Sequence, residues 1–212
     1  MGLFQKRTQI GNSQPFYKFG NQKTLLIVGL GNTGKKYDGT RHNIGFTCID
    51  SLAEKLEFPD WTEKKNLKCL ISEQNISDTK IVIIKPTTLM NLSGEAVQSV
   101  KKFYKVPDNQ IIAVYDELDI PFGQIRTRVG GSSAGHNGVE SLIAHINEGF
   151  GRVRIGIHNE LSEKADGKDF VLGKFTKEEL AKLPELLRET NSILSELIYG
   201  QTLTVETRSF LV

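Results

Sequence analysis

Four polar clusters in the sequence carry residue types that can perform acid–base chemistry without a metal or a covalent intermediate. A neutral histidine accepts a proton from water, a carboxylate orients that histidine, and amide groups donate hydrogen bonds to the substrate and to an oxyanion. The clusters contain Asn32 with His42, then Asn91, then Asp116, and finally His136 with Asn137. Together these residue types suit the attack of water on an ester or an amide.

His42 is the candidate general base. Apolar residues recur at helical spacing from Ile44 to Leu56, so His42 is predicted to lie in or next to the first turn of a helix, with Thr40 or Asn43 as its cap. The positive end of the helix dipole there disfavours the imidazolium and keeps the ring neutral. An isolated histidine more often only caps or packs, so the catalytic interpretation depends on the other clusters.

A glycine pattern just before His42 raises the alternative of a nucleotide site. Gly29 to Gly34 has the spacing G-x-G-x-x-G after the strand predicted at Leu25 to Val28, as in dinucleotide-binding folds. In that motif a helix begins at the second or third glycine, whereas Lys35 to Thr40 is polar and turn-like. A nucleotide-dependent oxidoreductase is therefore the least favoured interpretation.

The elements that must position these clusters alternate between strands and helices. This order predicts an α/β fold, a single domain with a central mixed β-sheet flanked by helices. Asp116 directly follows an apolar strand, and ligands in open α/β sheets bind at strand ends. Strands are predicted at 25–28, 69–73, 80–85, 111–115, 124–129 and 152–157. Helices are predicted from about residue 43, from about residue 94 with Asn91 or Ser93 as the cap, over 139–148, and from the capping box Thr176 to Glu179 onward. Pro184 is expected to kink or divide the last helix.

Two strands carry an Arg-x-Arg pattern on either side of a glycine-rich loop. Side chains two residues apart in a strand share a face, so each strand presents a pair of arginines, Arg126 with Arg128 and Arg152 with Arg154. This pattern predicts a phosphate-binding face, although solvated edge strands use the same residues. The loop from Gly130 to Gly138 ends in His-Asn-Gly, which favours a ligand-contacting loop over a linker.

Composition describes an ordinary globular chain of 212 residues with 38% hydrophobic and 25% charged residues and a net charge of +2. No apolar run approaches the roughly 18 residues that span a bilayer, and the four histidines show no metal-ligand spacing. Cys48 and Cys69 are predicted to be buried thiols. Residues 1–23 are predicted to be a basic, loosely ordered extension that could also touch RNA or act as a weak organelle address, and residues 24–212 one domain.

The chain resembles the bacterial-type peptidyl-tRNA hydrolases. The resemblance extends from about Leu25 to the last helix and is carried by four segments in order, IVGLGNTGKKYDGTRHNIGF, KPTTLMNLSGEAV, VYDELDIPFGQIRTR and GGSSAGHNGVESLI. It implies a single α/β domain with a central mixed sheet, cytoplasmic, usually monomeric, and free of metal and cofactor. The implied reaction is cleavage of the ester between the peptide and the 3′-terminal ribose of peptidyl-tRNA.

The same resemblance implies a role for each matching residue. His42 corresponds to the general base and Asp116 to its partner, Asn32, Asn91 and Asn137 to substrate-binding amides, Tyr37 and Met90 to residues lining the site, and Arg128 and Arg154 to basic residues that hold tRNA. The chain departs from the family at Thr33, usually proline, at Glu140, commonly lysine, and in its first 22 residues, which puts details of RNA affinity in doubt. A non-catalytic RNA-binding relative, of the kind recruited for intron splicing, is the second interpretation, and the intact histidine and aspartate favour the hydrolase.

Overall fold

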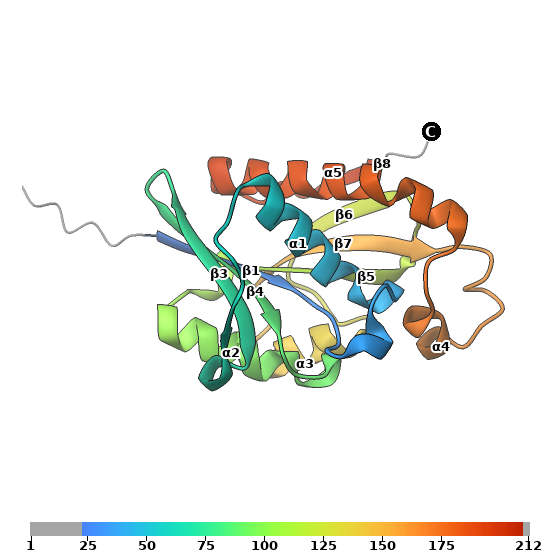
Figure 1. The fold of residues 1–212 in the computed structure, drawn as a ribbon, viewed down its shortest axis with the longest axis horizontal. Helices are drawn as coiled ribbons and strands as arrows, with labels where there is room; N and C mark the ends of the chain where they lie inside the picture. The colour runs from blue at the N-terminus through green and yellow to red at the C-terminus, as the bar shows by residue number, and fades with distance from the viewer. Residues whose placement is uncertain (1–22, 210–212) are drawn as a thin grey trace, which may run out of the picture.

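The centre of the fold is an eight-stranded mixed sheet, seen in a computed structural model that describes residues 23–209 (Figure 1). The strand order is β2-β3-β4-β1-β5-β7-β6-β8. Neighbouring strands are parallel from β4 through β1 and β5 to β7, and antiparallel toward both edges. The strands are β1 (Lys23–Gly29), β2 (Thr62–Lys64), β3 (Cys69–Ile76), β4 (Thr79–Pro86), β5 (Ile111–Pro121), β6 (Gln124–Val129), β7 (Gly151–His158) and β8 (Thr207–Ser209). The predicted α/β class with a central mixed sheet is confirmed.

Helices cover both faces of this sheet. α1 (Ile44–Lys55) and α5 (Lys177–Gly200) lie on one face, and α2 (Ser93–Tyr104) and α3 (Asn137–Ile146) lie on the other (Figure 1). The alternation along β1 divides its side chains between the two layers. Ile27 packs in the core that includes α1 and α5, whereas Leu26 and Val28 pack in the core that includes α2 and α3. β1 is therefore buried on both faces, as central parallel strands usually are.

The carboxyl ends of β1, β4 and β5 meet at one edge of the sheet. β1 leads into the loop that carries Asn32, β4 leads toward the short 3-10 turn η4 (Met90–Leu92), and β5 carries Asp116. The short helix α4 (Gly167–Leu172) lies at the same end of the molecule (Figure 1). This is the edge where open α/β sheets bind their ligands.

The segment after β1 lacks the helix that a dinucleotide motif requires. Two 3-10 turns, η1 (Lys35–Tyr37) and η2 (Arg41–Asn43), follow the glycines, and α1 begins only at Ile44. A pyrophosphate would therefore find no helix amino terminus directly behind the glycine turn. The structure agrees with the low rank that the sequence gives to a nucleotide-dependent oxidoreductase.

Several boundaries differ from the predicted ones. β5 continues past Tyr115 to Pro121, with an irregular register between Glu117 and Pro121, because it keeps pairing with β7 beyond the core. Of the two effects expected of Pro184, a kink or a division of the last helix, the division does not occur, since α5 runs unbroken over 24 residues. Its buried face, which includes Leu186 and Leu194, packs in the core, and we attribute the tolerance of the lost hydrogen bond to that packing.

The elements that sequence patterns did not predict are short. They are β2, β8, α4 and the 3-10 turns, including η3 (Lys65–Leu67) and η5 (Asp108–Gln110). Within residues 23–209 no helix combines the length and the apolar character needed to cross a membrane. The extension predicted at residues 1–23 lies outside the described residues except for Lys23, which is already the first residue of β1.

Candidate active site

His42 reaches the sheet because a glycine lets the start of α1 approach the strands closely. A Cβ added at Gly45 would lie 2.4 Å from the carbonyl oxygen of Val114 and 2.5 Å from that of Leu30. Only a residue without a Cβ fits this contact. His42 lies in η2, immediately before α1, as the sequence predicts. The close approach therefore brings His42 to Asp116, which follows Val114 by two residues on β5.

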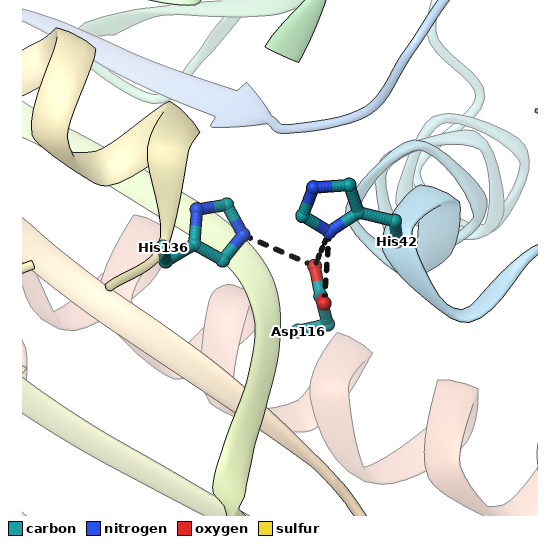
Figure 2. Close-up of side chains that lie close together, drawn as sticks. All are labelled: His42, Asp116 and His136. Carbon is teal, nitrogen blue, oxygen red and sulfur yellow. Dashed lines mark hydrogen bonds and ion pairs between the residues drawn. The ribbon is translucent and has the colours of Figure 1, made fainter. Parts of the chain in front are cut away.

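Asp116 lies between two histidines (Figure 2). Its side chain is 2% exposed, and its Oδ2 and Oδ1 lie 2.9 Å and 3.0 Å from His42 Nδ1. On the other side, Oδ1 lies 3.1 Å from His136 Nε2. The predicted partnership of His42 and Asp116 therefore exists as a direct contact, and His136 adds a second imidazole to the same carboxylate.

The hydrogen bonds around His136 determine which ring nitrogen carries its proton. His136 caps α3, and its Nδ1 accepts hydrogen bonds from the backbone N–H groups of Gly138 at 3.1 Å and Val139 at 3.2 Å. In the neutral ring an accepting Nδ1 leaves the proton on Nε2, which donates to Asp116. The carboxylate likewise accepts from Nδ1 of His42. The Nε2 atom of His42, which points away from Asp116 in Figure 2, thus has a free lone pair.

The charge of Asp116 follows from two opposing effects. Burial disfavours the carboxylate and by itself would raise the pKa of Asp116. The attraction of His42, then that of His136, and the hydrogen bonds from both rings outweigh burial and lower this pKa well below its usual range. Asp116 is therefore ionised at neutral pH, where it stabilises an imidazolium on His42.

Asn32 is held rigidly beside the histidine. Its backbone N–H donates to Oδ1 of Asn43 at 2.8 Å, and Nδ2 of Asn43 donates to the Asn32 carbonyl at 2.9 Å. The side-chain oxygen of Asn32 accepts from the backbone N–H of Met90 at 2.8 Å. These contacts orient the amide so that its Nδ2 group remains to donate to a substrate.

Neither α1 nor α2 has the side-chain cap that the sequence predicts. Asn43 occupies the position before α1 but makes no capping hydrogen bond, because its amide binds the Asn32 backbone instead. Leu92 occupies the corresponding position before α2, and neither Asn91 nor Ser93 caps that helix with its side chain. Asn91 is exposed and lines the cavity, so helix capping does not explain the asparagine at this position.

A cavity of about 730 Å³ brings the predicted site residues together. Its lining contains all seven residues predicted to act on or bind the substrate, Asn32, Tyr37, His42, Met90, Asn91, Asp116 and Asn137. The lining also includes Leu118 and part of α4, namely Gly167, Lys168, Val171 and Leu172. Sequence patterns indicated neither the contribution of α4 to the cavity nor the contact of His136 with Asp116. The only sequence signal for His136 was its position after a run of small residues and before a helix.

The comparison with known families decides the identity of the chain. Residues 26–210 match the family model described as peptidyl-tRNA hydrolase. The chain belongs to the peptidyl-tRNA hydrolase family. The peptidyl-tRNA hydrolase of Fusobacterium nucleatum is 44% identical over 179 residues, which is 84% of this chain and 91% of the relative. That of Shouchella clausii is 46% identical over 164 residues, which is 76% of this chain and 85% of the relative.

Solved structures of peptidyl-tRNA hydrolases share the fold. The crystal structure of the enzyme from Acinetobacter baumannii superposes with a TM-score of 0.77 and is 35% identical. The match covers 85% of this chain and 91% of that chain. The predicted fold class and the family resemblance are both confirmed, and the sheet with its helices on both faces is the peptidyl-tRNA hydrolase architecture.

The arginines that the family resemblance assigned to tRNA lie outside the cavity. β6 and β7 pair so that Arg126 faces Arg154 and Arg128 faces Arg152, which places the four side chains on one face of the sheet. Arg128 is half-buried, and its guanidinium lies over Gly131. Arg154 is also half-buried, with Nη1 3.8 Å from Oε2 of Glu117.

Arg152 does not belong to a phosphate-binding face. Its side chain is 1% exposed, its guanidinium lies over the Phe150 ring, and it donates to the carbonyl oxygens of Gly131 and Ser132. All of these partners belong to the protein, so the expectation of a phosphate contact at this position is wrong. Alternation in a strand predicts which face a residue occupies, but it does not show that a loop folds back to cover it.

The hydrogen bonding in this peptidyl-tRNA hydrolase site does not suit a metal ion. His42, Asp116 and His136 offer ligand atoms within 4.8 Å of one another, and they form the one such group among residues 23–209. However, Nδ1 of His136 already accepts two backbone hydrogen bonds, so its Nε2 must keep a proton in the neutral ring. A metal at Nε2 would require the loss of that proton or the loss of the α3 cap.

Proposed function

We propose that this chain hydrolyses the ester bond between the peptide and the 3′-terminal ribose of peptidyl-tRNA, releasing tRNA from stalled or dropped-off translation products. The observation that carries the proposal is the contact of His42 with an ionised, buried Asp116 in the wall of the cavity. This contact leaves Nε2 of His42 free to accept a proton. Membership of the peptidyl-tRNA hydrolase family supports the choice of substrate.

The reaction follows from the tautomer of His42. Nε2 accepts a proton from a water molecule as the water oxygen bonds to the ester carbonyl carbon. The carbonyl oxygen becomes an oxyanion, and its collapse breaks the bond to the ribose oxygen. The imidazolium then returns its proton to that ribose oxygen, giving a free peptide carboxylic acid and a tRNA with an intact 3′ end. Asp116 stabilises the imidazolium between the two proton transfers.

The three asparagines supply hydrogen bonds to the substrate. Asn32, Asn91 and Asn137 all line the cavity, and Asn32 has its amide oxygen occupied by the Met90 N–H. A positioned base contributes about 10² to 10⁴ in rate, and a donor to the oxyanion contributes about 10² to 10³. Tyr37 and Met90 shape the cavity around the ester. Because these donors address the backbone, we expect little preference for the side chain of the last peptide residue.

The tRNA body binds beyond the cavity in this proposal. Arg128 and Arg154 lie on the sheet face beside the glycine-rich loop, where partly exposed guanidinium groups can contact phosphates. Two of the departures from the family, Glu140 and Thr33, lie within the described residues. Glu140 is exposed in the first turn of α3, and Thr33 is half-buried after Asn32. We further propose that the enzyme works as a cytoplasmic monomer without metal or cofactor.

The test is hydrolysis of a defined substrate by the purified chain. We expect N-acetyl-aminoacyl-tRNA to be cleaved to tRNA and N-acetyl-amino acid. The rate should be unchanged after the protein has been treated with a chelator. Unblocked aminoacyl-tRNA should be cleaved far more slowly than the N-acetylated substrate. Binding of tRNA without any hydrolysis would contradict the proposal and support a non-catalytic RNA-binding protein. Activity that disappears with the chelator and returns with a metal would contradict the metal-free mechanism.

A further inference from the structure

Arg41, the residue immediately before His42, is a buried cation outside the cavity. It is 3% exposed, and its Nη2 lies 2.7 Å from Oε2 of Glu179, which is 6% exposed. Arginine is almost never fully buried without a partner, because removing its charge from water is costly. A buried arginine next to the proposed general base therefore calls for an explanation.

Further contacts of Arg41 reach α4 and the residues between α4 and α5. The guanidinium carbon lies 4.2 Å from the centre of the Phe170 ring and 5.5 Å from that of Phe175. Its Nη1 donates to the carbonyl oxygen of Phe170 at 3.5 Å. Its backbone N–H donates to the carbonyl oxygen of Gly173 at 3.0 Å. One residue thus joins the turn that carries His42 to a segment about 130 positions later in the sequence.

Glu179 is itself fixed by the elements around it. Its Oε2 accepts from the backbone N–H of Thr176 at 2.7 Å, which forms half of the capping box of α5. Its Oε1 accepts from Nδ2 of Asn159, just beyond β7, at 2.6 Å. Arg41 is therefore anchored to a carboxylate that is held by the start of α5 and by the end of the central sheet.

The segment held by Arg41 also forms one wall of the active-site cavity. Phe170 lies in α4, and four other residues of that helix line the cavity, Gly167, Lys168, Val171 and Leu172. His42, one residue after Arg41, also lines the cavity. The position of the base relative to the α4 wall consequently depends on the contacts of Arg41.

We propose that Arg41 is a positioning residue for ester hydrolysis, which holds the His42 turn and the α4 wall in register through Glu179 and the Phe170 carbonyl. This inference rests on the proposed role of His42 as general base. Stability alone does not require such a pair, because buried ion pairs can often be replaced by apolar residues at little cost. What a planar guanidinium adds is fixed geometry at several partners, which a lysine cannot reproduce.

The test compares Arg41→Lys with the same change at a remote ion pair. Arg208 of β8 binds Glu196 of α5 through Nη1 at 3.1 Å and Nη2 at 2.5 Å, and it does not line the cavity. Arg208→Lys is therefore the matched control. Glu179→Gln, which keeps the shape of the partner and removes its charge, is the second variant if Arg41→Lys fails to fold. For each folded variant, kcat and KM are measured on N-acetyl-aminoacyl-tRNA at a temperature where it remains fully folded.

A displacement of the base by about 1 Å is expected to cost up to 10²-fold in rate. We expect Arg41→Lys to lower kcat about 10- to 100-fold and Glu179→Gln about 3- to 10-fold, each with KM within about twofold of wild type. Arg208→Lys should keep the wild-type kcat. The proposal is overturned if kcat stays within twofold of wild type, if the loss is confined to KM, or if Arg208→Lys loses as much. If instead His42→Ala keeps wild-type activity, the proposed mechanism fails, which is a separate result.

Discussion

Replacing Asp116 with asparagine should slow the reaction strongly by reversing the tautomer of His42. His136 must donate from Nε2, because its Nδ1 accepts two backbone hydrogen bonds, so the asparagine oxygen is required at the position of Oδ1. The amide NH₂ group then replaces Oδ2, which lies 2.9 Å from Nδ1 of His42. A donor at that position favours His42 with an accepting Nδ1 and a protonated Nε2. In that form His42 is unable to take a proton from water.

The expected loss can be estimated from the lost charge. In wild type, an imidazolium on His42 and the carboxylate of Asp116 lie about 4 Å apart between charge centres, which is worth about 4 kcal/mol at an effective dielectric constant near 20. An energy of about 4 kcal/mol corresponds to about 10³-fold in rate. The wrong tautomer adds to this loss, so we expect Asp116→Asn to lower kcat by about 10³- to 10⁴-fold.

The assay is steady-state hydrolysis of N-acetyl-aminoacyl-tRNA, with tRNA binding measured separately. KM and the affinity for uncharged tRNA should change little, because the Asp116 side chain is buried against the two histidines. Asp119→Asn is the matched control, since Asp119 lies on the same strand with an exposed side chain. A kcat within threefold of wild type, or a loss seen only in binding, would refute the tautomer argument.

Three further expectations address the surroundings of this pair. His136→Ala should lower kcat about tenfold and the free energy of unfolding by about 1 kcal/mol, because the α3 cap and one hydrogen bond to Asp116 are lost together. Steady-state kinetics and denaturant unfolding measure the two effects. Arg128→Ala with Arg154→Ala should weaken all peptidyl-tRNAs alike and flatten the slope of log K against log salt by about 0.7 to 0.9 per lost contact, while a small N-blocked aminoacyl ester is cleaved as before; a wild-type slope would contradict this. Burial raises the pKa of the Cys48 and Cys69 thiols to about 12, so both should resist a thiol reagent at pH 8 in the folded protein and react after unfolding.

The central pair was predictable because both residues follow strong local signals. An apolar run rich in β-branched residues marked the strand that carries Asp116, and helical periodicity marked the start of α1 just after His42. Strand ends in an α/β sheet gather at one edge, so these two positions had a physical reason to meet. Their contact in the structure agrees with the prediction.

The remaining features depend on contacts that no local pattern encodes. The role of His136 follows from its backbone partners Gly138 and Val139, which fix its tautomer only once α3 has formed. Arg152 and Arg154 lie two residues apart on the same face of β7, but of these two arginines only Arg152 is covered by the glycine-rich loop, where it binds the Ser132 carbonyl. α4 has six residues, too few for a helical period to be visible in the sequence.

The most direct test of the mechanism is the chemical step in a His42→Ala variant. Single-turnover hydrolysis of N-acetyl-aminoacyl-tRNA with excess enzyme reports that step without contributions from product release. We expect a rate constant about 10²- to 10⁴-fold below wild type, equal to about 3 to 5 kcal/mol, with tRNA binding retained. His145→Ala is the matched control, since His145 donates to the Ser141 carbonyl within α3 and does not line the cavity. A His42→Ala rate constant within a few-fold of wild type would contradict the assignment of His42 as the general base.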